Sequence, residues 1–380
     1  MNIQENSSFK NNKENKFLIN SNEMKKNLLN KINFKNKRID YFDWLRILCS
    51  FSVVITHISA QKWNSSQIIS HEWKIFNFYD SISRFAIPIF FMISGTLFLE
   101  KDISFGIILN KYIKRIYIKL LFWSFFYSLR GKILHKNNCK KTFLIFLNGH
   151  YHLWYLFRIL GLYLITPFLK QIIKNKKLFK IFLILNIFFS ILFSNLLTII
   201  SYNSKDCYNN LNGIIYKLGL NYFLDHNQMY YIFGFYLNRL NIKPLFRIII
   251  YILGIFGSFF TFQMTYYISF KKNKKINFYS NFYINIFITS IGLFIFFKYN
   301  FSNLKYNNIK QFIQKLGSLT FGIYAIHPFV IEELDIRFNI NTLSFEPFYS
   351  VPINSLITFL ISLIFAYVIK LIPFINKYIL

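Results

Sequence analysis

The chain has 380 residues, of which 54% are hydrophobic and 21% aromatic, and its formal net charge is +30 at pH 7. This composition predicts many apolar stretches near twenty residues long, and therefore an all-α, polytopic membrane protein rather than a soluble one. The Lys and Arg residues lie mainly between the apolar stretches, where they set topology and meet anionic lipid headgroups. The charge therefore indicates membrane lipid, and not nucleic acid, as the partner.

Residues 1–42 are rich in Asn, Lys and Ser and contain little that could form a core. They predict a disordered or surface-lying basic cytoplasmic tail, which precedes a transmembrane domain at residues 43–380. The first forty residues lack the apolar core of a cleavable signal peptide. Three cysteines, Cys49, Cys139 and Cys207, are widely spaced and match no metal or redox motif, so no metal site is expected.

The first predicted span, from Asp43 to Ala60, contains an acid, an arginine and an imidazole. Its eighteen residues would form a helix of about 27 Å, long enough to cross a bilayer. Arg46 and His57 are eleven positions apart, which returns them to within roughly 20° of one helix face. Buried ionisable groups in membrane helices are costly unless they are paired or face water, so the pair indicates a polar cleft. The alternative is an Arg that reaches outward to the headgroups and a His that bonds a neighbouring helix.

Nine further apolar spans are predicted after the first. They lie at about 80–99, 113–130, 152–170, 178–200, 219–238, 244–262, 281–299, 311–333 and 352–372. With both termini in the cytoplasm, most Lys and Arg residues fall inside, as the positive-inside rule requires. Two basic loops, from Arg130 to Lys141 and from Lys271 to Lys275, would be external, as would the acidic segment that begins at Glu332.

This topology brings polar side chains from several spans to one depth, in the outer third of the membrane. They are His57, Arg84, His152, His226 and His327. Asp43 and Arg46 lie instead near the cytoplasmic end of the first span. If these faces turn inward, about ten helices surround a polar cavity that is open toward the outside and has a cationic entry from the inside.

Four segments carry a resemblance to a known family. The segment from Arg38 to His57 resembles the first helix of integral-membrane acyltransferase family 3, in which an Arg and a His are separated by ten residues. Three later segments resemble further motifs of that family in the same order: Arg84, Pro88, Phe90-Phe91 and Ser94-Gly95; His152-Leu-Trp154-Tyr155 with Tyr163 and Pro167; and Ser318, Gly322, Tyr324 and His327. The resemblance covers residues from about 38 to 372.

The resemblance implies transfer of an acyl group, usually acetyl, from a coenzyme A thioester to a hydroxyl of a carbohydrate or another exported molecule. Acetyl-CoA, or another acyl-CoA such as succinyl-CoA, would be a donor substrate, and no permanently bound cofactor is expected. The acceptor would be a cell-surface or exported glycan, free or lipid-linked. The protein would lie in the plasma or inner membrane as a multi-pass protein with a cytoplasmic N-terminus.

The same resemblance implies roles for individual residues. His57 would be the general base, because an imidazole can accept a hydroxyl proton near pH 7. Arg84 would stabilise the oxyanion or orient the acceptor. Arg46, oriented by Asp43, would bind the phosphates of coenzyme A. The expected substrate-binding residues are Ser94, His152, Tyr155, Arg158 and His327.

Several of these residues have plainer explanations. Ser94 and Gly95 are small enough to allow close helix packing, and Tyr155 could belong to an interfacial aromatic belt. His327 could serve packing alone. Arg158 departs from the family pattern, because an apolar or weakly polar residue is expected there. It either binds an anionic substrate group or shows that the fourth span begins later.

The alternative function is a membrane carrier or flippase for a polar or lipid-linked substrate, since a polar cavity with ionisable groups also suits transport. No internal repeat is evident in the sequence, and an inverted-repeat architecture therefore has no support. A scaffold or sensor would leave the buried charges unexplained. Acyl transfer requires coenzyme A and transport does not, so the two leading functions are separable by experiment.

Overall fold

The computed structural model describes residues 38–101, 103–135, 138–219, 225–302 and 307–380. The chain divides into two units, Met1–Ile39 and Asp40–Leu380. Of the predicted tail, residues 1–37 lie outside the described part, and the division at residue 43 stays a prediction. The regular secondary structure of the described residues is helical, which confirms the all-α fold class.

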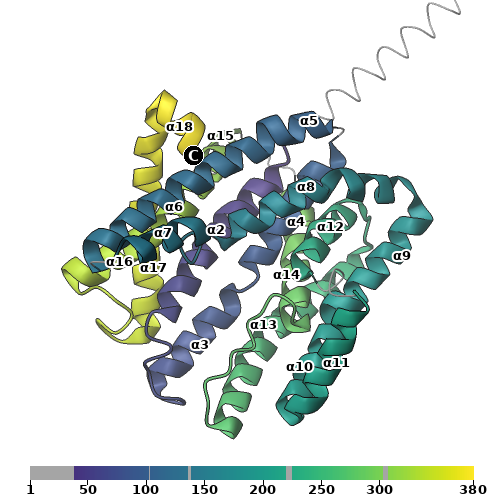
Figure 1. The fold of residues 1–380 in the computed structure, drawn as a ribbon, viewed down its shortest axis with the longest axis horizontal. Coiled ribbons are helices and arrows are strands. Elements are labelled where there is room, and N and C mark those ends of the chain that lie inside the picture. The colour runs from purple at the N-terminus through teal and green to yellow at the C-terminus, as the bar shows by residue number, and fades with distance from the viewer. Residues whose placement is uncertain (1–37, 102, 136–137, 220–224, 303–306) are drawn as a thin grey trace, which may run out of the picture. The chain divides into compact units, whose positions relative to one another are not determined.

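Helices lie at the positions of all ten predicted spans, and residues 220–224 of the sixth, 219–238, lie outside the described part (Figure 1). In chain order they are α2 (Asp40–Ala60), α3 (His71–Ser83) with α4 (Ala86–Glu100), α6 (Lys114–His135), α8 (Trp154–Lys174), α9 (Lys176–Ile187) with α10 (Ser194–Asn203), α12 (His226–Arg239), α13 (Pro244–Lys272), α14 (Ile284–Asn300), α16 (Thr320–Phe338) and α17 (Pro347–Leu371). Six helical stretches among the described residues are long and apolar enough to cross a membrane: Asp40–Ala60, His71–Glu100, Trp154–Lys174, Lys176–Ser201, Pro244–Lys272 and Pro347–Leu371. The chain is therefore a multi-pass membrane protein.

Shorter helical segments connect or extend the longer ones. They are α5 (Phe105–Ile107), the π-helices η1 (Ile108–Ile113) and η2 (Phe188–Phe193), α7 (Cys139–Asn148), α11 (Lys205–Lys217), α15 (Asn307–Gly317) and α18 (Pro373–Ile379). Of these, η2 lies within the predicted span at 178–200 and α15 overlaps the one at 311–333, and the sequence did not predict the others. The predicted span at 311–333 is wrong in its first part, because α15 ends at Gly317 and α16 starts at Thr320. A Cβ atom at Gly317 would lie 2.7 Å from Asp43 Oδ1, so the glycine allows this corner to pack on α2.

The second predicted span, 80–99, starts too late. The helical stretch begins at His71, where the side chain of Ser70 accepts a hydrogen bond from Trp73 N and caps α3. It is interrupted after Ser83, and α4 resumes at Ala86. The interruption follows from Pro88, which has no N–H and whose ring clashes with the carbonyl four residues earlier, that of Arg84. The proline thus places Arg84 at a helix break.

Glycines set the closest helix contacts. A Cβ atom at Gly95 of α4 would lie 1.7 Å from the Tyr231 carbonyl oxygen, and one at Gly234 of α12 would lie 2.2 Å from the Met92 carbonyl oxygen. Without side chains at these positions, the backbones of α4 and α12 can touch. This contact fixes α12, which begins at His226, relative to α4.

Polar contacts join segments that the predicted topology places on the outer side of the membrane. Arg130 Nε lies 3.0 Å from Glu332 Oε2, and the same guanidinium also pairs with Glu333. Lys275 donates from its amino group to the main-chain oxygen of Asn64, in the connection between α2 and α3. The acidic segment of α16 thus balances the basic end of α6.

Candidate active site

A cavity of about 340 Å³ lies among helices that are distant in sequence. Its polar and aromatic lining includes Thr56, His57, Ser83, Arg84, His152, Trp154, His226, Tyr279, Ser280, Asn281 and Tyr324. The volume is at the lower end of the range for ligand pockets in proteins. Four of the five residues expected at one depth of the membrane, His57, Arg84, His152 and His226, line this cavity, and the fifth, His327, does not.

His57 lies at the centre of an aromatic cluster beside the cavity. Its ring centroid is 5.1 Å from that of His327 and 5.2 Å from that of Tyr151. Within the described part of the chain, no hydrogen bond holds either ring nitrogen of His57. Both nitrogens can therefore serve a ligand that enters the cavity.

His327 is fully buried and held in one tautomer by its own helix. Its Nδ1 lies 3.2 Å from the carbonyl oxygen of Ile323, and because a carbonyl only accepts, Nδ1 carries the hydrogen. Nε2 is then an acceptor, and this buried atom has no partner among the described residues. The His327 ring lies 5.6 Å from that of His152, so the unpaired nitrogen is part of the same cluster.

His152 is positioned by a neighbour that the sequence interpretation missed. The Nδ1 atoms of His150 and His152 are 3.0 Å apart, and Tyr324 donates to the main-chain oxygen of His152. The His152 Nε2 atom is buried and unpaired within the described residues. His150 Nε2 lies 3.6 Å from Glu332 Oε1, which is beyond hydrogen-bond distance, but the negative charge of the carboxylate still favours the tautomer with its hydrogen on Nε2. The signal in the sequence that could have indicated this pair is two histidines separated by one residue.

Burial, and secondly the charge of Arg130, lower the pKa of His150 to about 4. His150 is therefore neutral at pH 7. A neutral ring with its hydrogen on Nε2 accepts at Nδ1. His152 then donates from Nδ1, which leaves its Nε2 as an acceptor.

Arg84 is fixed by a carboxylate from the preceding turn. Its Nη2 atom lies 2.5 Å from Asp80 Oδ2, and Asp80 is 2% exposed. The guanidinium also lies over the ring of Tyr279, 4.6 Å from the ring centroid. The Arg84 Nε atom is buried and has no partner among the described residues. The sequence interpretation missed Asp80 and Tyr279, although an acid and an arginine four apart on a helix are a recognisable pair.

Arg46 lies away from the cavity lining, near the start of α2. Its Nη1 atom is 2.9 Å from Asp43 Oδ1, and the Asp43 side chain is fully buried while that of Arg46 is 26% exposed. Tyr155 contacts Ser94 and lies within the electrostatic reach of Arg46. Its ring centroid is 5.9 Å from that of Tyr324, which lines the cavity. Tyr155 thus lies beside a residue that lines the cavity.

Arg158 is exposed on the second turn of α8, and within the described residues no hydrogen bond or ion pair holds it. Its charge reaches His226, which lines the cavity.

Asp225 accepts a hydrogen bond from Asn227 N at 3.0 Å and caps α12, so its role is local. In the described part of the chain, no group of three or more His, Cys, Asp or Glu side chains is arranged to hold a metal ion.

Comparison with known proteins gives one match. A family model described as an acyltransferase domain, that of acyltransferase 3, matches residues 39–371. No curated protein and no solved structure matches the chain. The matched range includes every residue that lines the cavity.

Proposed function

The chain belongs to the acyltransferase 3 family and is a membrane acyltransferase, and from this premise we propose that it transfers an acetyl or similar small acyl group from acyl-CoA to a carbohydrate hydroxyl. The acceptor is a cell-surface or exported glycan, free or lipid-linked. One observation carries the proposal: His57 and Arg84, from separate helices, line the same cavity. A base and a fixed cation beside one space are what acyl transfer needs.

His57 is the proposed general base. A sugar hydroxyl is a poor nucleophile near pH 7, so His57 takes its proton as the oxygen attacks the thioester carbon. A new C–O bond forms, the thioester C–S bond breaks, and the proton passes to the departing sulfur to give free coenzyme A. His57 suits this role because it lines the cavity and, among the described residues, no hydrogen bond engages its ring nitrogens.

Arg84 is proposed to stabilise the oxyanion that forms on the thioester carbonyl. Asp80 and the Tyr279 ring hold the guanidinium in place before substrate arrives. A donor that needs no reorganisation stabilises the transition state by roughly 3 to 4 kcal/mol in well-studied cases. The N–H groups of Arg84 that do not bond Asp80, including the one at Nε, can donate to this oxyanion.

The other predicted residues are assigned to binding. The unpaired Nε2 atoms of His152 and His327 accept hydrogen bonds from acceptor hydroxyls. Arg46, oriented by Asp43, binds the charged end of the donor, whose arm passes Ser94 and Tyr155. Arg158 attracts an anionic group of the substrate. In this proposal ten helices cross the plasma or inner membrane, and the N-terminus is cytoplasmic.

The test measures label transfer from radiolabelled acetyl-CoA by purified protein in nanodiscs, with crude cell-surface glycans as acceptor. We expect transfer by the native protein, loss of at least 100-fold with His57→Gln, and no change with His71→Gln. His71 is the matched control, because it is 69% exposed and pairs with Glu346 outside the cavity.

Normal transfer by a correctly inserted, normally abundant His57→Gln protein would refute the role of His57. A carrier would move its substrate in the absence of coenzyme A, whereas the proposed enzyme has no activity without a donor. Absence of both turnover and coenzyme A binding by the native protein would contradict the choice of donor.

A further inference from the structure

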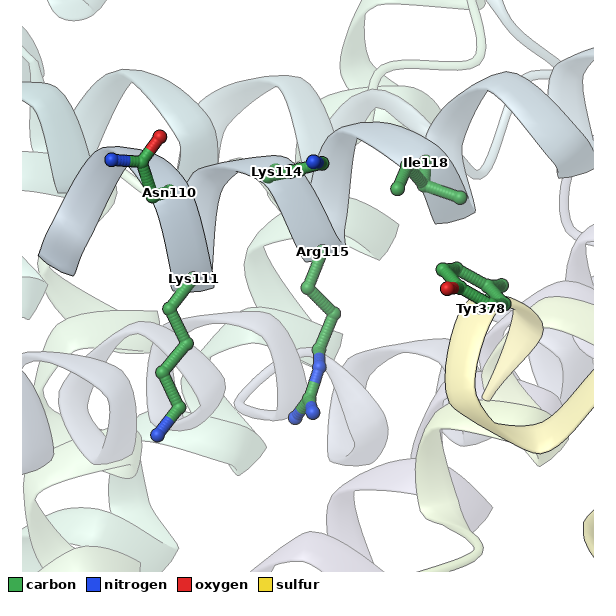
Figure 2. A pocket seen from close by; sticks show the side chains of 6 residues that line it. All are labelled: Asn110, Lys111, Lys114, Arg115, Ile118 and Tyr378. Carbon is green, nitrogen blue, oxygen red and sulfur yellow. The ribbon is translucent and has the colours of Figure 1, made fainter. Parts of the chain in front are cut away.

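A second cavity, of about 290 Å³, lies between the stretch η1–α6 and helix α18. Figure 2 shows its lining residues: Asn110, Lys111, Lys114, Arg115, Ile118 and Tyr378. In this view Lys111 and Arg115 extend to the same side of their helix, and the Tyr378 ring lies beside Ile118. Of the described residues that line it, three are cationic and none is acidic.

Among the described residues, no carboxylate balances the charges of this pocket. Lys111, Lys114 and Arg115 occupy positions i, i+3 and i+4, so they share one helix turn. Within the described part of the chain, no carboxylate pairs with any of the three. Like charges this close repel one another, and an anion in the pocket would remove the repulsion.

The cation on the next turn of the helix has a different environment. Lys119, one turn further along α6, is buried, and its amino group contacts the main-chain oxygen of Leu380 and lies 4.2 Å from the Phe321 ring centroid. Lys119 therefore already has partners within the protein. The three cations of the pocket remain exposed beside a hollow.

The pocket lies at the same end of the helices as Arg46. Tyr112 adjoins Lys111, and its ring centroid is 4.8 Å from that of Phe98, which stacks on Tyr163 at 3.9 Å. Tyr163 lies within the electrostatic reach of both Arg46 and Tyr112. A few aromatic contacts thus connect the pocket with the cation that the proposed mechanism assigns to the donor.

We propose that the Lys111–Lys114–Arg115 pocket binds phosphate groups at the nucleotide end of the acyl donor. This inference rests on the proposed function, and it adds a site that is separate from Arg46. An arginine binds phosphate oxygens in a forked geometry, and lysines add point charges. The cavity is too small for the whole donor, so it takes the phosphates and leaves the acyl arm free to extend past Arg46.

The experiment compares two donors in nanodiscs of phosphatidylcholine: acetyl-CoA, and acetyl-pantetheine, which lacks the nucleotide and its phosphates. For Lys111→Ala/Arg115→Ala we expect the KM for acetyl-CoA to rise about tenfold or more, because charged contacts to phosphate are lost. The KM for acetyl-pantetheine should stay unchanged. Lys176→Ala/Lys177→Ala is the matched control, since it removes two exposed charges outside the pocket.

A binding measurement that needs no turnover separates this proposal from the proposed function. Equilibrium dialysis with adenosine 3′,5′-bisphosphate should show binding to the native protein and at least tenfold weaker binding to the pocket variant. If the native protein binds the bisphosphate more tightly than the pocket variant does but transfers no acyl group, the result supports the phosphate site and refutes the proposed acyl transfer. Equal binding by the two proteins, or none by either, overturns the pocket.

An anionic lipid headgroup offers the same phosphate chemistry. The pocket variant is therefore also compared in nanodiscs with and without phosphatidylglycerol. If the variant loses a phosphatidylglycerol-dependent stabilisation but keeps the native KM for acetyl-CoA, the ligand is lipid and the donor assignment is wrong.

Discussion

The Nδ1 atoms of His150 and His152 lie 3.0 Å apart, so one of the two rings must donate a hydrogen to the other. Glu332, 3.6 Å from His150 Nε2, favours His152 as the donor. The Nε2 atom that His152 presents to the cluster is then an acceptor. His150 is thus a positioning residue for the site, although it does not line the cavity.

The first prediction is that His150→Phe lowers kcat about tenfold and leaves the KM for the donor unchanged. The phenyl ring keeps the stacking on Tyr127, whose centroid is 4.2 Å from that of His150, but it cannot bond His152. One lost hydrogen bond corresponds to about 1 kcal/mol. His150→Asn, which still offers a polar atom near the Nδ1 position, should restore much of the rate. A purely structural role would lower the amount of folded protein with both variants and leave kcat intact.

The second prediction concerns stability in acid. The pKa of His150 is about 4 in the folded protein and about 6.5 when unfolded. Between these values the unfolded chain binds more protons, so stability falls as pH drops from 6.5 to 4. The contribution is at most about 3 kcal/mol. Melting temperatures across this range should fall less steeply for His150→Asn than for the native protein, and parallel curves would contradict the shift.

The third prediction separates charge from geometry at Arg84. Arg84→Lys keeps a cation but loses the fork that both pairs with Asp80 and faces the cavity, so we expect kcat to fall about 100-fold. Asp80→Asn should instead reduce stability by about 3 kcal/mol, because it leaves a partly buried guanidinium unpaired. Steady-state kinetics and thermal unfolding in detergent measure the two effects. A kcat near the native value in Arg84→Lys would rule out the oxyanion role.

The fourth prediction concerns the break between α3 and α4. Pro88→Ala restores an N–H that can bond the Arg84 carbonyl, so the two helices should join and turn Arg84 away from the cavity. We expect transfer to fall at least tenfold while the melting temperature changes by only a few degrees. Pro352→Ala, within α17 and outside the cavity lining, is the control and should retain activity. Native activity in Pro88→Ala would show that the break does not position Arg84.

The fifth prediction tests the contact between α4 and α12. Gly95→Ala should prevent stable folding, since its Cβ would overlap the Tyr231 carbonyl oxygen at 1.7 Å. Gly161→Ala is matched in chemistry, and no atom lies within 4 Å of its added Cβ. It should be neutral or slightly stabilising, because alanine favours helices. Yields of monodisperse protein after detergent extraction give the readout, and comparable yields would contradict the close contact.

The break in the ninth predicted span shows where sequence patterns fail. The predicted span at 311–333 joins two helices that the structure separates between Gly317 and Thr320, where a Cβ atom at Gly317 would lie 2.7 Å from Asp43 Oδ1. The sequence prediction missed the start of α3 because the first residues of this helix have low hydropathy. Asn77 and Trp73 are buried by tertiary packing, so this polar stretch is inside the protein although its hydropathy is low.

The sequence by itself determined the class of protein, the approximate positions of its long apolar helices and the motifs of its family, because these depend on local hydrophobicity, spacing and order. It also placed Arg46 and Asp43 together, since residues three apart on a helix are neighbours. Only the tertiary structure decided which polar groups meet. The partnership of His150 with His152 and Glu332, and the Tyr279 ring under Arg84, depend on contacts between segments far apart in the chain. Such contacts are fixed by how helices pack, which no local pattern specifies.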